Sequence, residues 1–505
     1  MIAREAESVN APSLASLIAS LSLLVHDAAH KGTAAHEAEL AIFKSVLAIG
    51  REAFALFLRL NGDGGLGDKV VLKDGSEVRR LPEAHERPYR SVFGDFTLSR
   101  VCYGTREGQE ILFVPLDSRL KLPKSSYSYL LQEWDQALGA ECAWERVAEV
   151  IERMTGVEQP VDSLERMNRG MAEAAAPFRE ARPLPAAEDE GEVFVVTADG
   201  KGVPMRRGEG DPAPKAHRGK GDKANKKRMA VVGAVYSVGR HHRTAADVVA
   251  ALFRDPRTPG QECPERPEPV GKHLQAQLSR AADGSLAEPM DLVFGSMKAE
   301  MDKRGEPGKE KEVVCVMDGQ ECLWDAKQRH FGEEATEVLD LLHALPRLWQ
   351  AAHLFREEGS EEASGFVRER LERVLRGEGK GVVSGLRRMG TMRGLSGTGK
   401  KSLGTICGYL GKNLGRMRYD EYLEKGYPIA SGVIEGACRH YVKDRMERSG
   451  MRWTREGAQA MLDVRGEWLN GDWAAFQAFR IEWETERLYP HRNRVAGEAF
   501  FALAV

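Results

Sequence analysis

Residues 194–200 of the chain read FVVTADG, and residues 313–319 read VVCVMDG. Each stretch is a short apolar run, which predicts a buried β-strand, and each run ends in an aspartate followed by a glycine. Open α/β sheets place their ligand groups at the C-terminal ends of strands. We therefore expect Asp199 and Asp318 to end two strands of one α/β sheet, with a further strand at residues 229–238 (MAVVGAVYSV).

Two aspartates at neighbouring strand ends can share Mg²⁺, which prefers hard oxygen ligands and keeps positions open for phosphate. Two such ions about 3.5–4 Å apart can activate an attacking oxygen and stabilise a leaving oxygen on phosphorus. Such a site usually needs a third carboxylate, and the candidate is Glu435 in YPIASGVIEG (427–436), where a helix is expected after Pro428. The pattern has a plain alternative, because Asp-Gly is a common turn dipeptide and a lone glutamate on a helix is usually solvated.

The composition limits the class of protein. The chain has 505 residues, which at about 150 residues per domain suggests three domains. Its 42% hydrophobic and 30% charged residues exclude wholesale disorder, collagen and a multi-span membrane protein. The seven cysteines are widely spaced and include no C-x-x-C pair, so we expect neither a disulfide framework nor a zinc ribbon, and a cytoplasmic location. No apolar run reaches about 18 residues, so no membrane contact is expected.

Basic residues gather in two places, although the formal net charge is only −3. Residues 201–229 hold ten Lys and Arg against three Asp and Glu, and residues 380–418 hold nine Lys and Arg and no acid. Such stretches favour a polyanionic partner, with solvated surface loops as the alternative. The candidates for phosphate contact in them are Lys226, Lys227, Arg228, Lys400 and Lys401. The first three precede a strand, so they could instead protect a strand edge from unwanted pairing.

Residues 394–401 (GLSGTGKK) nearly match a phosphate-binding P-loop. A P-loop needs Ser or Thr after its lysine to hold Mg²⁺, and a strand before its glycines. Here Lys401 follows Lys400 and no apolar strand precedes the glycines. We therefore expect no nucleotide cofactor, and a nucleotide-driven enzyme is a rival reading that ATP binding would revive.

Periodicity gives the rest of the organisation. Residues 144–155 and 161–171 read as two helices around Gly156, which is typical of a helix-turn-helix or of an ordinary helical hairpin. Residues 177–192, rich in proline and acids, read as a linker. The other expected elements are helices within 13–60, a hairpin at 69–81, strands within 91–116, a strand near 243–252, helices at 271–282 and 288–302, and helical blocks at 360–425 and 431–487.

Four segments of the sequence resemble one protein family. They are ADGKGVPM (198–205), KRMAVVGAVYSV (227–238), VMDG (316–319) and YPIASGVIEGACRHYVKDRMERSGMRW (427–453). Together they look like the DDE-type insertion-sequence transposases of bacteria, of the ISKra type, which is related to Mutator-like elements. The resemblance covers roughly residues 190–470, and its last motif is long and therefore specific.

The resemblance implies an RNase H-like catalytic domain within an α/β fold, two Mg²⁺ ions for which Mn²⁺ can substitute, and cutting and joining of DNA ends. It implies that Asp199, Asp318 and Glu435 are the catalytic metal ligands, separated by 119 and 117 residues. The second gap implies a helical insertion before the glutamate helix. The family's Cys/Asp-x-x-His signature is matched by Asp340-Leu-Leu-His343, which makes His343 a further catalytic candidate, with a core histidine as the alternative.

Basic residues follow the glutamate. Glu435, Arg439 and Lys443 are spaced i, i+4, i+8 and share one face of a regular helix, so the two cations are expected to hold phosphates, as are Arg445 and Arg448. The alternative is a salt-bridge ladder on a solvated helix.

These observations predict the following domains: an N-terminal helical and β-rich region (1–120), a helical region with the helix-turn-helix candidate (121–180), an RNase H-like catalytic domain in two parts (190–355 and 426–487), a basic helical insertion (356–425) and a C-terminal tail (488–505). We expect a nucleoid-associated transposase that acts on double-stranded DNA, its element ends and its target, as a homo-oligomer. Two rivals share the sequence signals: a catalytically retired transposase acting as a DNA-binding regulator, and an RNase H-like nuclease that does not join strands.

Overall fold

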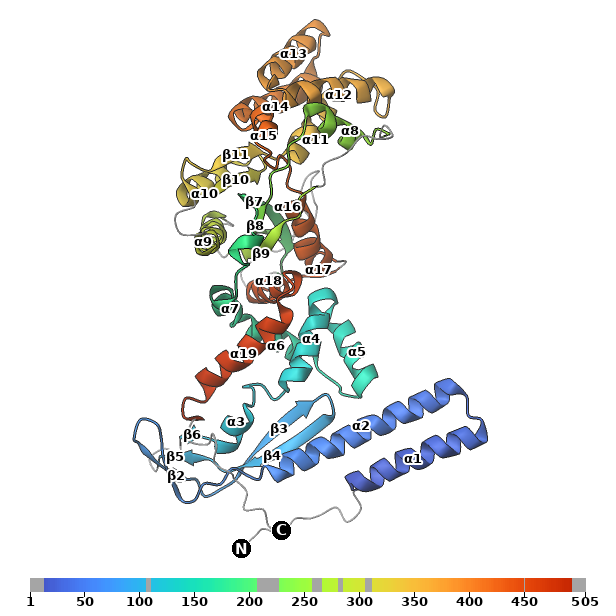
Figure 1. Cartoon of the computed structure of the whole chain (residues 1–505), viewed down its shortest axis with the longest axis vertical. Coiled ribbons are helices and arrows are strands. Elements are labelled where there is room, and N and C mark those ends of the chain that lie inside the picture. The colour runs from blue at the N-terminus through green and yellow to red at the C-terminus, as the bar shows by residue number, and fades with distance from the viewer. Residues whose placement is uncertain are drawn as a thin grey trace, which may run out of the picture. The chain divides into compact units, whose positions relative to one another are not determined.

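The computed structural model describes residues 13–105, 110–206, 227–256, 266–279, 285–304, 311–448 and 450–492. The chain divides into two compact units (Figure 1). Residues 1–179 and 473–505 form the first unit, and residues 180–472 form the second. The division lies within the proline- and acid-rich stretch, but the chain returns to the first unit at Trp473, so the end of the helical block 431–487 does not belong with the catalytic candidates.

The first unit combines helices with two small antiparallel sheets. One sheet has the order β1-β2-β5-β6, and β3 pairs with β4 in a separate hairpin. The two N-terminal helices and the hairpin at 69–81 confirm the expectations from the sequence. The elements are α1 (Leu14–Lys31), α2 (Ala35–Leu60), β1 (Lys69–Val71), β2 (Glu77–Arg80), β3 (His85–Ser91), β4 (Gly94–Arg100), β5 (Tyr103–Gly104), β6 (Ile111–Phe113), α3 (Pro115–Leu120), α4 (Tyr129–Glu141), α5 (Trp144–Thr155), α6 (Val161–Ala172), α7 (Ala175–Ala181) and α19 (Trp473–Leu488).

The two expected helices around Gly156 are α5 and α6. Gly156 ends α5 in the left-handed conformation, with φ of 76°, which a glycine adopts without steric cost. Both helices bury an apolar face, and α4 packs against each of them. The helical pair is therefore confirmed, and its use as a DNA-reading helix-turn-helix stays a prediction.

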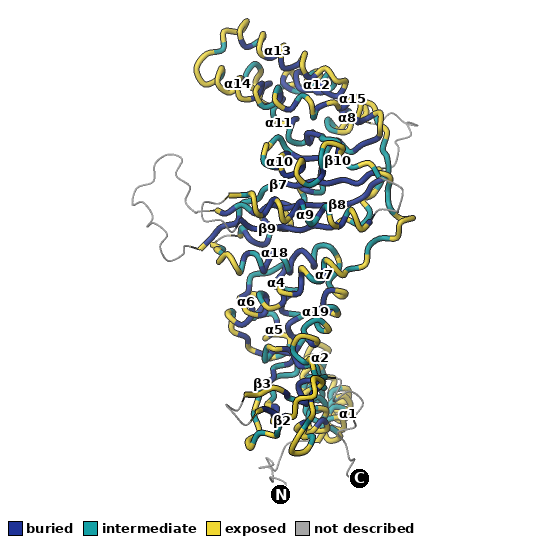
Figure 2. The backbone as a smooth tube through the Cα atoms, turned by 90° about the vertical axis from the view of Figure 1, so that its left-hand side faces the viewer, coloured by how far each residue is buried: buried dark blue, intermediate teal, exposed yellow. Residues whose placement is uncertain are grey.

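The second unit is built on a five-stranded mixed sheet with the order β11-β10-β7-β8-β9. The first three strands along the chain, β7 (Val193–Pro204), β8 (Lys227–Val238) and β9 (Val270–Leu278), form an antiparallel meander. The last two, β10 (Glu312–Met317) and β11 (Thr336–Leu339), run parallel to β7. Figure 2 shows β7 and β8 buried along most of their length, as continuous apolar runs at the centre of a sheet should be.

Helices cover both faces of this sheet. On one face Val196 and Cys315 pack against α9 (Ala287–Lys303) and α10 (Glu321–Phe331). On the other face Val195 and Val314 share a core with α8 (Ala245–Phe253), α11 (Leu341–Ala352) and the helices that follow. The unit is therefore an α/β fold with a core on each side. No helix among the described residues is both long and apolar enough to cross a bilayer.

Three sequence expectations are wrong in this unit. β7 continues to Pro204, so Asp199 lies inside a strand and not at its end, because β8 pairs with β7 along its whole length. Residues 245–253 form α8 and not a strand, since Thr244 and Asp247 make a capping box at its start. The helix expected at 271–282 is instead β9, which pairs with β8. Gln459 of α18 (Arg455–Leu469) accepts from the N–H of Leu278 and donates to the carbonyl of Ala276.

The insertion is helical, as expected, and covers the β11 edge of the sheet. Tyr419 donates its hydroxyl to the carbonyl of Leu339 at 2.8 Å, and Tyr422 donates to the carbonyl of Glu337 at 2.8 Å. These bonds satisfy carbonyls that an edge strand would otherwise expose. The helices from here to the unit's end are α12 (Glu361–Leu375), α13 (Gly379–Met392), α14 (Gly397–Lys412), α15 (Tyr419–Glu424), α16 (Gly432–Ala437), the π-helix η3 (Cys438–Lys443), α17 (Asp444–Met446) and α18, with 3₁₀ turns η1 (Ala187–Asp189) and η2 (Leu414–Arg416).

Candidate functional site

Three aspartates stand in one row across the parallel strands. Cys315 of β10 pairs with Val196 of β7, and Met317 of β10 pairs with Leu339 of β11. Continuing both registers by the same offsets puts Asp318 level with Asp199 on one side and with Asp340 on the other. The backbone N–H of Asp340 donates to the carbonyl of Met317 at 2.8 Å, which holds the third aspartate to this level. Neighbouring strands lie about 4.8 Å apart, so the row is short.

The alternation of strand residues puts the three carboxylates on one face. Val195 and Val314 belong to the core beneath α11 and the insertion, and residues an even number of positions further along a strand share their face. Asp199 and Asp318 therefore point to this side of the sheet. Helix α16, which carries Glu435, and η3 pack against β7 on the same side. The fold thus gathers residues from four separate segments.

Asp199 accepts two hydrogen bonds in this arrangement. Its Oδ1 accepts from the N–H of Gly200 at 2.6 Å, and its Oδ2 accepts from the thiol of Cys438 at 3.4 Å. Burial, followed by the charge of Asp199, raises the pKa of the Cys438 thiol, so the thiol stays protonated and donates. Sequence reasoning did not single out Cys438. Its signal was its place in the glutamate helix, three residues after Glu435.

Asp318 turns the chain away from β10 into α10. Its Oδ1 accepts from the N–H of Gln320 at 2.6 Å, and its carbonyl accepts from the indole of Trp324 at 2.8 Å. Burial raises the pKa of the Asp318 carboxyl, and the charge of Asp199 raises it further, whereas His343 lowers it. A buried carboxyl whose pKa a neighbouring carboxylate raises further is a common feature of sites that bind a cation.

Asp340 ties the end of β11 to the segment before the glutamate helix. It is fully buried; its Oδ1 accepts from the N–H of Leu342 at 2.8 Å and its Oδ2 accepts from the N–H of Ser431 at 3.2 Å. The N–H of Leu341 also donates to the carbonyl of Ile429 at 2.9 Å. Both acceptor oxygens of Asp340 thus serve backbone groups of two different segments.

Ser431 links Asp340 to the helix that carries Glu435. Its hydroxyl accepts from the N–H of Ile434 at 3.3 Å and caps α16. Burial raises the pKa of Glu435, and the charges of Asp340 and Asp199 raise it further, with His343 opposing them. The charges of Asp340, His343 and Asp199 therefore act on the carboxyl of Glu435, although this residue is exposed.

His343 lies beside the row and not inside the core. Its side chain is 28% exposed, and its Nδ1 lies 3.6 Å from Oδ2 of Asp340. Asp340 raises the pKa of His343 against the effect of burial, with further contributions from Asp318 and Asp199. The structure thus brings all four predicted catalytic residues into one electrostatically coupled group.

The donor set fits Mg²⁺ in its chemistry. Carboxylate oxygens are hard ligands. Burial raises the pKa values of Asp318 and Glu435, and the negative charge of Asp199 adds to both shifts, so a bound cation would relieve that charge. Among the described residues, however, no group of three or more His, Cys, Asp or Glu side chains is already arranged around one metal position.

The insertion reaches the site through Tyr409 of α14. The N–H of Gly319 donates to the Tyr409 hydroxyl at 3.2 Å. A Cβ on Gly319 would lie 2.6 Å from Cε2 of Tyr409 and 2.7 Å from Nδ2 of Asn413, closer than real contacts allow. The glycine after Asp318 is therefore required by the packing of the insertion.

The predicted basic residues fall into two groups. Arg439, Lys443 and Arg448 are exposed around η3 and α17, and Lys400 and Lys401 are exposed in the first turn of α14. The π-helix η3 breaks the regular i, i+4, i+8 spacing on which the shared face was predicted. Lys227 is exposed and forms an ion pair with Glu447, and Lys226 lies outside the described residues.

Two of the predicted phosphate contacts are wrong, because the side chains are buried. Arg445 is 1% exposed; its guanidinium lies 5.0 Å from the ring centroid of Trp453 and its Nη1 lies 3.6 Å from Sδ of Met451. Arg228 is 6% exposed, and its Nη1 donates to the carbonyl of Ser279 at 3.4 Å. Both guanidinium groups hold the fold together and are not presented to a ligand.

Residues 394–396 lie between helices α13 and α14, and residues 397–401 begin α14, so a helix and not a strand precedes the glycines. Comparison with protein-family models and with curated proteins gives no match to this chain. The functional argument therefore depends on the site itself.

Proposed function

We propose that the protein is a DNA transposase of the DDE type, which cleaves and joins DNA strands with the help of Mg²⁺ held by Asp199, Asp318 and Glu435. The observation that carries the proposal is the row of carboxylates on one face of the sheet, facing the helix of Glu435. Asp199 and Asp318 are 119 residues apart in sequence and level with each other in the sheet.

The sheet topology supports the proposal. An RNase H-like core consists of a three-stranded antiparallel meander followed by two strands parallel to the first, in the order 3-2-1-4-5. The strand order β9-β8-β7-β10-β11 has this form. The long helical insertion between β11 and α16 also has the position that the sequence resemblance implies.

The chain's own groups have separable roles in this proposal. Bound Mg²⁺ would supply activation of the attacking oxygen and charge stabilisation at phosphorus. Asp199, Asp318 and Glu435 would hold it, and Asp340 acts as a positioning residue, because it fixes Ser431 and with it the start of α16. His343, whose pKa is raised, would present a proton and a positive charge beside the carboxylates.

The exposed cations around the site would hold the DNA backbone. Arg439 and Lys443 follow Glu435 on the helix that leaves the site, and Lys400 and Lys401 stand on the insertion helix that also provides Tyr409. Contacts of this kind fix the position of the duplex without reading its sequence. We propose double-stranded DNA as the partner on this basis.

We propose that two or more copies assemble on DNA. Neither α1 nor α2 contains a buried residue in the described structure, although both are rich in apolar residues. Ile18, Leu40 and Phe43 are 53%, 54% and 45% exposed. Helices of this composition gain their stability by burying an apolar face, and a bundle formed with a second copy would cover both.

The test uses the purified full chain and labelled duplexes from the DNA that flanks its gene. With Mg²⁺ we expect cleavage at the element ends by the wild-type protein, and none by Asp318→Asn. Asp325→Asn is the matched control, because Asp325 is an exposed carboxylate on the neighbouring helix α10 and is outside the row. Cleavage that survives in Asp318→Asn would contradict the proposal. Binding of the ends without any Mg²⁺-dependent product would favour the retired, regulatory form.

A further inference from the structure

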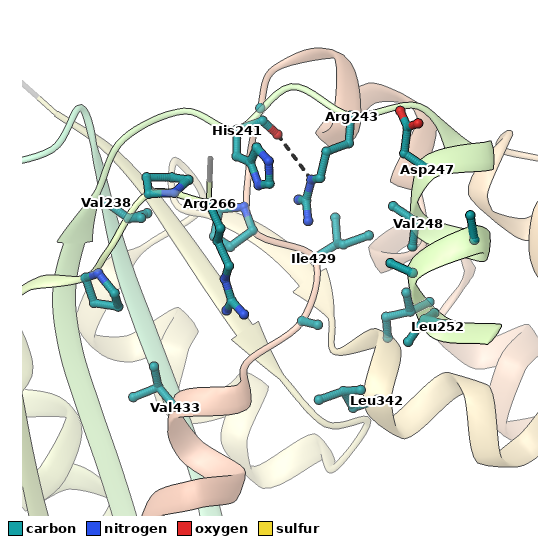
Figure 3. Close-up of a pocket in the computed structure, with 18 of the residues that line it drawn as sticks. Val238, His241, Arg243, Asp247, Val248, Leu252, Arg266, Leu342, Ile429 and Val433 are labelled. Atoms are coloured by element: carbon teal, nitrogen blue, oxygen red, sulfur yellow. Dashed lines mark hydrogen bonds between the residues drawn. The ribbon is translucent and has the colours of Figure 1, made fainter. Parts of the chain in front are cut away.

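A cavity of about 790 Å³ lies in the second unit. It is bounded by the end of β8, by α8 and by residues 426–433, and its apolar wall includes Val248, Leu252 and Ile429 (Figure 3). Its volume is in the range of pockets that hold a small organic molecule. The carboxylate site contributes none of its four predicted catalytic residues to this lining.

Two arginines direct their guanidinium groups into this cavity. Figure 3 shows Arg243 and Arg266 reaching into the same space from opposite sides of His241. Arg243 is anchored by two backbone carbonyls: its Nε donates to His241 at 3.2 Å and its Nη2 donates to Tyr427 at 3.1 Å. Burial lowers the pKa of Arg243, and the charge of Arg266 lowers it further, which reflects two like charges close to each other.

Neither guanidinium has a carboxylate partner among the described residues. Two acids line the cavity, and each is engaged elsewhere. Asp247 accepts from the backbone and hydroxyl of Thr244, and Asp255 pairs with Arg368. Among the described residues that line the cavity, the guanidinium groups of Arg243 and Arg266 therefore stand beside an apolar wall and no carboxylate pairs with either of them. An anion bound between the two guanidinium groups would be stabilised by both positive charges.

We propose that this cavity is a binding site for a small amphipathic anion, in which one phosphate or carboxylate lies between Arg243 and Arg266 and an apolar group lies against Val248, Leu252 and Ile429. The two parts of the ligand follow from the two kinds of lining. The planar guanidinium of Arg suits two-pronged contact with phosphate or carboxylate oxygens, and the aliphatic wall suits a chain of a few carbons. This inference does not depend on the transposase proposal, because it uses none of the carboxylate site.

Isothermal titration calorimetry of the full chain tests the proposal. The probes are hexyl phosphate, hexanoate, hexanol and inorganic phosphate. We expect one molecule of hexyl phosphate or hexanoate to bind per chain, and the stronger of the two identifies the anionic group. Hexanol, which lacks the charge, and inorganic phosphate, which lacks the apolar chain, should each bind at least about tenfold more weakly than that stronger probe.

Three variants locate the site. Arg243→Met and Arg266→Met remove a charge but keep a long side chain, and each should weaken the binding of hexyl phosphate at least about tenfold. Leu252→Trp should fill the apolar part of the cavity and weaken the binding of hexyl phosphate as well. Arg393→Met, an exposed arginine of α13's end outside the cavity, is the matched control and should leave affinity unchanged. Near-ultraviolet circular dichroism checks that each variant is folded.

The outcome that overturns the proposal is specific. The proposal is rejected if hexyl phosphate binds the two arginine variants as tightly as it binds the wild type. It is also rejected if hexanol binds as tightly as hexyl phosphate, or if neither anionic probe binds. If Arg243→Met does not fold, Arg266→Met still decides the matter, because the residue Arg266 is exposed and Arg266 makes no hydrogen bond to the described chain.

Discussion

Asp340→Asn tests how the glutamate helix is held in place. Asp340 accepts one backbone N–H from Leu342 at 2.8 Å and one from Ser431 at 3.2 Å, in a fully buried position. Asparagine has one acceptor oxygen, and asparagine caps helices as well as aspartate does, so we expect it to keep the bond to Leu342. The amide of Ser431 then loses its acceptor and faces an NH₂ donor.

The expected magnitude follows from this one lost bond. A buried N–H left without a partner costs about 1–3 kcal/mol. If the loss lowers the free energy of local opening of residues 427–437 by this amount, amide exchange there should accelerate about 5- to 150-fold, because each 1.4 kcal/mol is a factor of ten. Asp340→Ala removes both acceptors and should show a larger effect. The readout is hydrogen–deuterium exchange followed by mass spectrometry on the peptide that contains Ser431.

Asp247→Asn is the matched control for this experiment. Asp247 also accepts hydrogen bonds at a helix start, but it is exposed, and Thr244 is its carboxylate's only hydrogen-bond partner within the described part of the chain. Its replacement should leave exchange at Ser431 unchanged. Unaltered exchange of the 427–437 peptide in Asp340→Asn, with wild-type stability, would refute the assignment of Asp340 as the positioning residue.

Three further predictions concern packing, pH and assembly. Gly319→Ala puts a Cβ 2.6 Å from Cε2 of Tyr409 and should lower the free energy of unfolding, measured in urea, by about 1–3 kcal/mol. Adding Tyr409→Ala should recover part of this loss. A double variant no more stable than Gly319→Ala would count against the contact. Burial raises the pKa of Asp135 to about 7, so the stability of the protein should fall as pH rises from about 4 to 7. Asp135→Asn should therefore raise the melting temperature at pH 8 but not at pH 4. An equal change in melting temperature at both pH values would contradict this. Leu40→Glu combined with Phe43→Glu should reduce the mass measured by light scattering to that of one chain, whereas an unchanged oligomer would exclude the α1–α2 surface.

The limit on the Asp135 effect follows from linkage. The pKa of about 7 in the folded state exceeds the ordinary value of 3.8, so the folded protein holds this proton more tightly than the unfolded chain does. The penalty on folding is absent below about pH 4 and complete above about pH 7. About three pKa units at 1.36 kcal/mol each set an upper bound of about 4 kcal/mol on the gain in Asp135→Asn at pH 8.

The strands that the sequence predicted correctly are those that carry their signal locally. β8 and β10 are uninterrupted apolar runs, and such runs are buried wherever the chain places them. β9 reads VGKHLQAQL, whose Lys, Gln, Ala and Leu favour helix, and it is a strand because β8 and α18 supply its hydrogen bonds. Tertiary contacts override propensity in this way, and no local pattern reports them.

The site shows the same division. The types and order of Asp199, Asp318 and Glu435 were readable, because Asp-Gly after an apolar run and a long helix motif are local signals. The alignment of Asp199, Asp318 and Asp340 in one row could not be predicted, since it depends on the register of β10 with its two partner strands. The burial of Arg445 was equally hidden, because a basic helix gives no sign of which arginine folds back over Trp453.

The most direct test of the account is whether Asp199, Asp318 and Glu435 meet at one metal. Fe²⁺ can replace Mg²⁺, and with ascorbate and peroxide it generates radicals that cut the polypeptide next to the bound ion. The account predicts cuts close to all three residues, suppressed by excess Mg²⁺ and lost together in Asp318→Asn. Cuts near only one of the three, or a pattern that Asp318→Asn leaves unchanged, would contradict it.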